Sequence, residues 1–525
     1  MTQAPVDTTI DVPTNRLYRT LSAIERAGNK LPHPFWLFVI LIAILGAVSA
    51  VLAGLNVTVT LPGKNETVAV KNLLSMEGAK FAAESALSNY ATFPPLATVV
   101  VVLLGVAVLE RSGLLTALLR ATIGRLPASV LTFSIAFSSM IAHVMSDSAY
   151  LVMIPLGALA FRAVGRSPVL GLMVAYAATA VGFNASPLVT PADAIRSSLS
   201  TAAARLVDKD YIITPVATYF FTAASSVVLA IAIAFIVDKL LARRPEFGSA
   251  SLEADFATAD KLFNTTGSTS RAVKLAPIEA KALTVSAVAF LVCVALIAAV
   301  LLPGSPFLGA GGDIVTSVVV KNIAIFLCII FAILGIVYGR ITGSIPKLSE
   351  VPVAMAEGIR NLAPVLVLFF VVAQFLAYFA WTNIGSVISV NGAQALKSLE
   401  APHLVILLVI VLAISVLNML ITSGSAMWSI LAPVIIPMVM YVGLKPEASM
   451  VAFMIGDSVT NCVTPLNGYF VLALGFVQQF RKGAGIGTML SFTIPLAVGV
   501  LVVWTAFFVL WYALGIPLGP GVPVR

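Results

Sequence analysis

Three aspartates interrupt apolar stretches of this 525-residue chain. Asp147 lies within Ser-Asp-Ser-Ala, Asp193 follows a Val-Thr-Pro triplet, and Asp457 lies within Ile-Gly-Asp-Ser-Val-Thr-Asn. A carboxylate inside a membrane is energetically costly and usually functional, so all three are candidate ligand or ion sites. Two alternatives stand beside this interpretation. Asp457 could cap a helix or bond a neighbouring one, and Asp193, near Arg196, could lie at the wet outer end of a broken helix.

The polar residues around Asp457 have the spacing of a cation site. Asp457 and Asn461 are four residues apart and therefore share one face of a helix. Backbone carbonyls freed near Pro465 would add further oxygen ligands, and Asn418 could join them. Hard cations prefer such all-oxygen surroundings. We therefore predict an ion site formed by Asn418, Asp457 and Asn461.

A short pattern occurs twice in the chain, once in each half. Residues 146–149 and 423–426 both read Ser-x-Ser-Ala, and each is followed, at a similar separation, by Val-Thr-Pro at 189–191 and 463–465. Each Ser-x-Ser-Ala lies in the middle of a long apolar region. Two matches in the same order indicate an internal repeat whose units both contain broken membrane elements.

The broken elements have the chemistry of a binding site. Non-helical backbone at membrane depth is tolerated where it is buried in protein or lines a wet cavity. A hairpin tip presents helix-end N–H groups, which favour anions, and serine and glycine let a ligand approach closely. The alternative is a seam of small residues between packed helices. The candidate binding residues at the two tips are Ser146, Asp147, Ser148, Ser423, Gly424 and Ser425. Trp428, near the second tip, fits stacking on an aromatic ligand or packing in the core.

The elements that must hold these residues are membrane helices. Hydrophobic residues make up 59% of the chain and charged residues only 10%, a composition that excludes an ordinary soluble domain. Apolar runs of about 20 residues are long enough to span a bilayer. We predict spans near 34–54, 94–109, 168–188, 212–240, 281–303, 319–338, 361–380, 447–478 and 486–514, with interrupted regions at about 131–161 and 404–442.

Polar segments divide the chain into two membrane halves, 34–240 and 278–525. Residues 1–33 form a predicted cytoplasmic N-terminal segment, and the polar stretch 241–277 is a predicted cytoplasmic linker whose composition does not favour order. Most of the 31 lysine and arginine residues fall on one side if the N-terminus is cytoplasmic. The two interrupted regions then open to opposite sides, which gives the inverted repeat common in secondary transporters. The charge bias is compatible with re-entrant hairpins and with paired crossings.

Several other functions are disfavoured. The chain has no glycine-rich nucleotide loop, no His-Glu-x-x-His motif and no metal-like cysteine spacing, so we expect no cofactor and no enzymatic activity. Its net charge of +8 suits cytoplasmic loops better than nucleic-acid binding. A channel, and a membrane enzyme using Asp147 and Asp193, remain as alternatives to a transporter.

Longer stretches of the sequence resemble one family. "LPHPFWLFVILIAIL", "AHVMSDSAYLVMIPLGALAF", "TSGSAMWSILAP", "FLAYFAWTNIG", "GDSVTN" and "GIPLGPGVP" occur in the order typical of the p-aminobenzoyl-glutamate transporter (AbgT) family, from about residue 20 to the C-terminus. The resemblance implies an all-α polytopic membrane protein of the bacterial inner membrane. It also implies a homodimer whose protomers each have nine transmembrane helices, two opposed re-entrant hairpins, a scaffold and a moving transport core.

The resemblance also implies a function. It points to proton- or sodium-coupled transport of p-aminobenzoyl-glutamate or related aromatic antimetabolites, with sulfonamide export in some members. The rivals are a sodium-coupled dicarboxylate transporter on the same hairpin plan and an ion channel. Substrate-site positions carry over onto Asp193, Ser425, Trp428, Asp457 and Pro465, and sodium-site positions onto Asn418, Asp457 and Asn461. One position departs from the family: Met454 stands where an arginine is expected. This leaves open either the glutamyl-type substrate or the way in which it is held.

Overall fold

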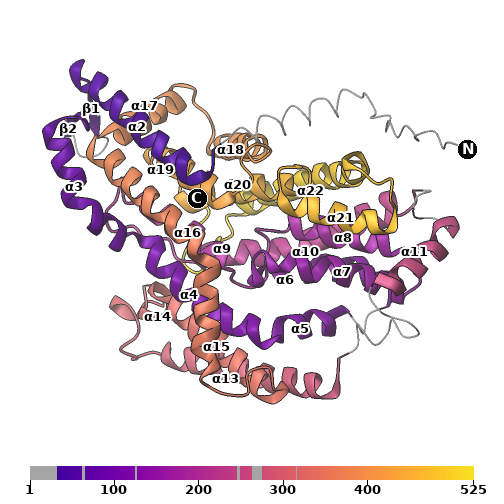
Figure 1. Ribbon diagram of the computed structural model, residues 1–525. Helices are drawn as coiled ribbons and strands as arrows, with labels where there is room; N and C mark the ends of the chain where they lie inside the picture. Colours follow the sequence, from indigo (N-terminus) through magenta and orange to yellow (C-terminus); the bar gives the residue numbers. More distant parts are fainter. Residues whose placement is uncertain are drawn as a thin grey trace, which may run out of the picture.

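The computed structural model describes residues 32–61, 66–123, 127–244, 247, 249–262, 275–314 and 316–525, and these are mostly helical (Figure 1). Apart from an isolated bridge near the C-terminus, the described strands are β1 (Thr58–Leu61) and β2 (Glu66–Ala69), which pair antiparallel with Thr58 opposite Ala69. This small hairpin is not predicted from the sequence, but it leaves the all-α class unchanged. Of the predicted N-terminal segment, only its last two residues lie within the described part.

One group of helices forms the scaffold. It contains α2 (Pro34–Gly54), α3 (Met76–Ala91), α4 (Pro94–Ser112), α5 (Leu114–Ile123), α13 (Pro277–Val300), α14 (Val318–Lys321), α15 (Ile323–Thr342) and α16 (Glu350–Trp381). Helices α4 and α15 touch at small residues: a Cβ atom at Gly105 would lie 2.5 Å from the Cys328 carbonyl oxygen. Such close contacts replace the missing hydrophobic driving force between helices in lipid.

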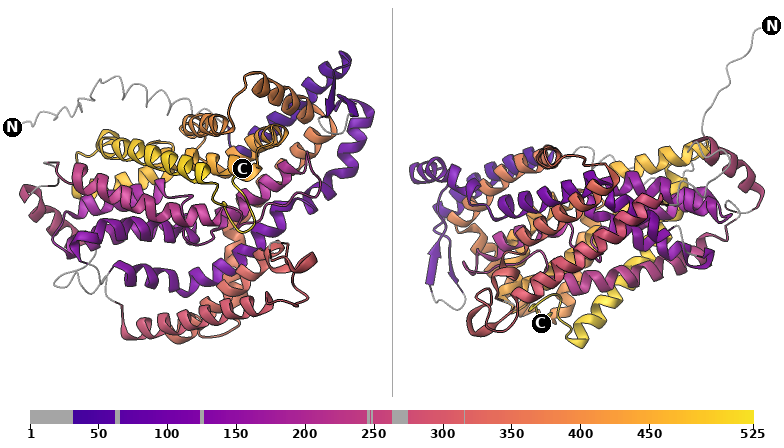
Figure 2. Two further views of the ribbon diagram at one scale, coloured as in Figure 1. Left: turned by 180° about the vertical axis from the view of Figure 1, so that it is seen from behind. Right: turned by 90° about the horizontal axis from the view of Figure 1, so that it is seen from below.

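The second group forms the transport core. It contains α6 (Leu131–Ala142), η2 (His143–Met145), α7 (Ser148–Ala163), α8 (Pro168–Val181), α9 (Pro191–Ala204), α10 (Tyr219–Ile236), η3 (Val237–Leu241), α18 (His403–Leu417), α19 (Gly424–Tyr441), α20 (Pro446–Val459), η6 (Thr460–Cys462), α21 (Gly468–Phe480) and α22 (Ile486–Leu514), with α17 (Ile384–Ser398) leading into it. Figures 1 and 2 show α13 and α15 on one side of α4 and α5, and the core helices α6 and α7 on the other.

The two interrupted regions form the predicted hairpins. The first is α6 and α7, joined through the turn at Ser146, whose φ of 48° is unusual for a residue with a side chain. The second is α18 and α19, and α19 begins where the Ser423 hydroxyl accepts a hydrogen bond from the Ala426 amide. The ends of both helix pairs lie within two residues of the predicted limits.

Two of the predicted spans are broken helices. Helix α8 ends at Val181 rather than near residue 188, and the chain is non-helical until α9 begins at Pro191. A capping box starts α9: the Thr190 hydroxyl accepts from the Asp193 amide, and the Asp193 carboxylate accepts from the Thr190 amide at 2.8 Å. In the second half, α20 ends at Val459, one short turn follows, and α21 resumes the span at Gly468.

Within the described residues, the spans amount to nine crossings. By length and composition, eight described helices or joined helix pairs are apolar enough to cross a membrane. One of the eight, α19, is a hairpin limb, whereas the broken pairs α8–α9 and α20–α21 consist of helices too short to be counted. The crossings are α2, α3–α4, α8–α9, α10, α13, α15, α16, α20–α21 and α22.

The predicted linker 241–277 contains a helix, α11 (Ser249–Leu262), that its composition does not suggest. This helix packs against α7, α8 and α21 of the core. At one of these contacts, Arg162 Nη2 lies 3.0 Å from Asp260 Oδ2. The rest of the linker lies largely outside the described residues. Helix α11 therefore belongs spatially to the core.

Candidate substrate and ion site

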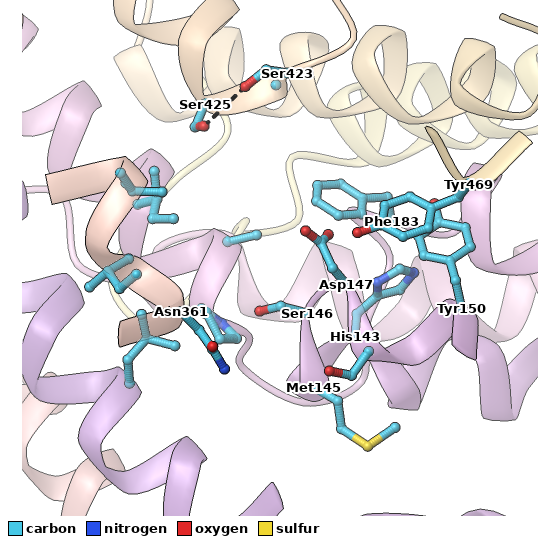
Figure 3. A pocket seen from close by; sticks show the side chains of 18 of the residues that line it. His143, Met145, Ser146, Asp147, Tyr150, Phe183, Asn361, Ser423, Ser425 and Tyr469 are labelled. Carbon is cyan, nitrogen blue, oxygen red and sulfur yellow. Dashed lines mark hydrogen bonds between the residues drawn. The ribbon is translucent and has the colours of Figure 1, made fainter. Parts of the chain in front are cut away.

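A cavity of about 590 Å³ lies where the tips of the two hairpins meet α4 and α16 of the scaffold (Figure 3). Both broken helices contribute to its wall. Eight of the residues predicted from the sequence line it: Ser146, Asp147, Ser148, Ser423, Gly424, Ser425, Asp457 and Asn461. The structure therefore brings both copies of the Ser-x-Ser-Ala pattern to one space.

The wall at the first hairpin combines a carboxylate with aromatic rings. The Asp147 side chain is exposed in the cavity, beside the Tyr469 hydroxyl. The Tyr150 and Tyr469 rings stack with centroids 4.1 Å apart. The Phe183 and His143 rings are T-shaped to one another, with centroids 5.1 Å apart. Figure 3 shows Asp147 among these rings. This end of the cavity is therefore acidic and aromatic.

The wall at the second hairpin brings a helix start against a carboxylate. Gly424 is the first residue of α19, and a Cβ atom there would lie 2.7 Å from Asp457 Oδ1. The Ser423 and Ser425 hydroxyl oxygens are 3.5 Å apart at the same tip. Glycine at 424 thus permits the carboxylate of α20 to approach the positive end of α19.

A chain of polar contacts runs from Asp457 into the first repeat. Asn184 Nδ2 donates to Asp457 Oδ2 at 2.9 Å and to the Met454 carbonyl at 3.2 Å. The side-chain oxygen of Asn184, Oδ1, accepts a hydrogen bond from Arg196, and Arg196 Nη2 lies 2.7 Å from Asp193 Oδ1. Within the described residues, Asp457 Oδ1 has no hydrogen-bond partner. The break in the first repeat therefore holds one oxygen of this buried carboxylate, and the other oxygen faces the start of α19.

Arg196 and Asn184 are site residues that the sequence interpretation missed. Arg196 is the only lysine or arginine among the described residues that line the cavity, and its side chain is 5% exposed. It provides a guanidinium near the position where the family resemblance leads one to expect an arginine at Met454. The available signal was an arginine three residues after Asp193, on a helix otherwise rich in small residues.

Asp193 does not itself line the cavity. One of its oxygens accepts from the Thr190 amide and hydroxyl, both at 2.8 Å, and the other pairs with Arg196. Asp193 therefore starts α9 and holds the arginine in place.

The residues of the predicted sodium site converge on Asn418. Its Nδ2 position lies 2.6 Å from the Asp457 carbonyl oxygen, 3.0 Å from Thr460 Oγ1 and 3.0 Å from Asn461 Oδ1. Asn418 Oδ1 has no partner within the described residues. Rotating the Asn418 side-chain amide by 180° would exchange Nδ2 and Oδ1. Oδ1 would then face the Asp457 carbonyl oxygen, Thr460 Oγ1 and Asn461 Oδ1, and four oxygens are a ligand set suited to a hard cation. Thr460 joins the three predicted residues.

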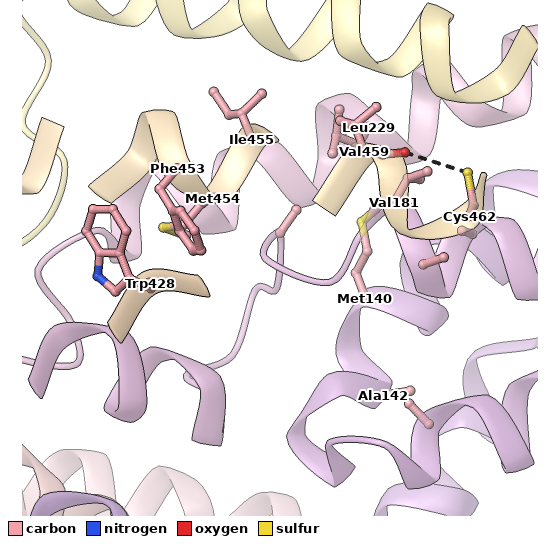
Figure 4. Packing of buried hydrophobic residues seen from close by; sticks show 14 of the residues in the cluster. Met140, Ala142, Val181, Leu229, Trp428, Phe453, Met454, Ile455, Val459 and Cys462 are labelled. Carbon is pink, nitrogen blue, oxygen red and sulfur yellow. Dashed lines mark hydrogen bonds between the residues drawn. The ribbon is translucent and has the colours of Figure 1, made fainter. Parts of the chain in front are cut away.

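Trp428 and Pro465 lie behind the wall rather than in it. The Trp428 ring is fully buried, donates from Nε1 to Ser200 Oγ at 2.9 Å and packs on Phe453 with centroids 4.4 Å apart (Figure 4). Phe453 lines the cavity, so the tryptophan supports that surface from behind. Pro465 is buried in the break before α21. Asn418, likewise, contacts Asp457 from outside the lining.

The charges around the cavity are unbalanced. Glu110, Asp147 and Asp457 line it, against the single guanidinium of Arg196, which is already paired with Asp193. A dianionic ligand entering this space would meet net negative charge.

Comparison with known proteins agrees with this architecture. Residues 19–525 match the sequence model of the AbgT putative transporter family. The p-aminobenzoyl-glutamate transport protein of Escherichia coli K12 is 34% identical over 504 residues, which cover 96% of each chain.

Two solved structures share the fold. The YdaH transporter of Alcanivorax borkumensis has an unusual topology; it superposes with a TM-score of 0.82 at 34% identity over 93% of this chain and all of that one. MtrF of Neisseria gonorrhoeae, described within a class of antimetabolite efflux pumps, superposes with a TM-score of 0.88 at 36% identity over 96% of this chain and all of that one. These relatives are transporters rather than enzymes. The chain is a multi-pass membrane protein that belongs to the AbgT transporter family.

Proposed function

We propose that this protein is a secondary active transporter that moves p-aminobenzoyl-glutamate, or related aromatic antimetabolites including sulfonamides, across the bacterial inner membrane. The observation that carries the proposal is the position of Asp457. Its carboxylate touches the tip of the second hairpin, while its backbone carbonyl belongs to the oxygen cluster at Asn418. Substrate and coupling ion would thus meet at one residue.

The geometry supports coupling through charge. The Asp457 carboxylate occupies the positive end of α19, next to Ser423 and Ser425, where an anionic group of the substrate would bind. Two anions at one helix end repel each other. A sodium ion at Asn418 and Asn461, or a proton on Asp457, would remove that repulsion. Ion binding and substrate binding would therefore favour one another.

The proposal includes the membrane arrangement that the resemblance implies. The N-terminus is cytoplasmic, the protein is a homodimer, and the transport core moves against the scaffold to open the cavity to either side. The position of the cavity between α4, α16 and the core supports this division, because sliding along that boundary would change the access to the cavity. Mass measurement of the purified protein in detergent tests the dimer.

The function is tested by flux into proteoliposomes with sodium and proton gradients imposed separately. We expect p-aminobenzoyl-glutamate to move when one of these gradients is applied, and succinate and citrate not to compete with it. The variant Asp457→Ala should fold but lose coupled flux. Glu84→Ala, which removes an exposed carboxylate from α3, is the matched control. Wild-type coupling in Asp457→Ala, or competition by succinate alone, would refute the proposal.

A further inference from the structure

The two ends of the cavity differ in what they can bind. The end at the first hairpin presents the Asp147 carboxylate, which only accepts hydrogen bonds when ionised. The end at the second hairpin presents the Ser423 and Ser425 hydroxyls. A chain of hydrogen bonds from Arg196 to Asn184, and from Asn184 to Asp457, connects a guanidinium to this end. Figure 3 shows the two serines on a separate element from the Asp147 group.

The partner of Asp147 is a hydroxyl and not a basic side chain: the Tyr469 hydroxyl hydrogen-bonds to its carboxylate. No ion pair joins it to a basic residue within the described part of the chain, and its side chain does not cap α7. Its neighbours are the Tyr469 hydroxyl and the rings of Tyr150 and Phe183. An exposed acceptor among aromatic rings suits a flat ligand ring that carries an N–H donor at its edge.

We propose that Asp147, with Tyr150, Phe183 and Tyr469, is the subsite for the aromatic amine of the substrate. The carboxylate end of the substrate then lies toward Arg196 and the second hairpin. This assignment rests on the proposed function and fixes the orientation of the ligand within it. A ligand with carboxylates at both ends would place one of them against Asp147, and like-charge contact would exclude it. Asp147 is thus a specificity-determining residue.

The test compares p-aminobenzoyl-glutamate with benzoyl-glutamate, which differs only in lacking the amine. In wild-type proteoliposomes we expect the amine to raise kcat/KM by roughly ten- to a hundred-fold, the range expected for a hydrogen bond to a charged group. Asp147→Leu removes the acceptor and should reduce this ratio to about one. Asp147→Asn keeps one acceptor oxygen and should give an intermediate ratio. Glu84→Ala should retain the wild-type ratio.

The outcomes separate this proposal from the function on which it rests. Equal transport of the two ligands by the wild type, or an unchanged ratio in Asp147→Leu, overturns the amine subsite and leaves the transporter intact. If neither ligand moves in the wild type, the proposed function fails and the subsite fails with it. If Asp147→Leu moves neither ligand, the ratio is read from Asp147→Asn and from equilibrium binding of both ligands to each variant in detergent. A wild-type ratio there would refute the assignment.

Discussion

Asn184 donates from Nδ2 to Oδ2 of Asp457 at 2.9 Å, so the break in one repeat directly holds the carboxylate at the end of α20 in the other. The same amide accepts from Arg196 through its oxygen. One uncharged side chain therefore separates a buried guanidinium from a buried carboxylate. Their mutual attraction is retained, and neither charge is fully neutralised by contact with the other.

Replacing Asn184 with alanine should uncouple the two repeats. Arg196 and Asp457 would each lose a buried hydrogen bond, at a cost of about 1–3 kcal/mol in stability. We expect a lower thermal unfolding temperature and a large loss of coupled flux. Asn89→Ala is the matched control, because Asn89 Nδ2 donates to Gln374 Oε1, also at 2.9 Å, within the scaffold. Asn89→Ala should lower stability while leaving the ratio of ions to substrate transported unchanged. A wild-type ratio in Asn184→Ala would contradict the bridging role of Asn184.

Gly424→Ala should impair function more than stability. The added Cβ would lie 2.7 Å from Asp457 Oδ1, so the carboxylate or the hairpin tip must shift. Ion-dependent flux should fall sharply, with a raised half-saturating ion concentration. In Gly475→Ala, on α21, the added Cβ meets nothing within 4 Å, and helix propensity favours alanine by about 1 kcal/mol. Normal flux in both variants would show that the close approach at Gly424 is not required.

Ser146 should tolerate glycine better than a branched residue. Its φ of 48° lies in the region that glycine enters without steric cost. Ser146→Gly should therefore preserve or raise the thermal unfolding temperature, whereas Ser146→Val should lower it by an amount corresponding to about 1–3 kcal/mol of backbone strain. Ser88→Val, in α3, is the comparison, because Ser88 is exposed and has ordinary helical geometry. A larger loss there than at Ser146 would contradict the strain argument.

Helix α11 should give the protein a pH-dependent stability through Asp255. This carboxylate lies 3.1 Å from the Ser167 hydroxyl and 3.6 Å from Arg481 Nη2. Burial raises the pKa of Asp255 above its ordinary value, against the opposing effects of these two partners. The folded state therefore binds this proton more tightly than the unfolded state. The resulting stabilisation is present at low pH and is lost as the pH rises through the folded-state pKa.

The variant Asp255→Asn does not titrate, so its unfolding temperature should rise relative to that of the wild type between a pH near 3.8 and neutral pH. Differential scanning fluorimetry across that range measures the difference. Asp210→Asn, at an exposed position, provides the baseline. A difference that stays constant with pH would show that the ion pair with Arg481 balances burial, and one that favours the wild type at neutral pH would show that the ion pair outweighs burial.

Local chemistry accounts for the features that the sequence predicts well. Hydropathy determines where the chain spans the bilayer, since each unbroken apolar run must satisfy its own backbone hydrogen bonds. Serine, glycine and proline at 146–149, 189–191 and 423–426 stop and restart helices through interactions within a few residues. For that reason the tips of both hairpins lie at the predicted positions. Helix α11 was missed because its order comes from contacts with α7, α8 and α21, which its composition does not reveal.

The sequence by itself determined that this is a membrane protein with two broken repeats and acidic residues at the breaks. Only the tertiary structure decided which residues share the cavity. It brought Arg196 and Asn184 to Asp457, and it placed Trp428 behind Phe453, away from the ligand space. Such contacts depend on how α8, α9 and α19 cross α20. Crossing is set by the packing of whole helices, so residues far apart in the chain reveal their contacts only in the folded molecule.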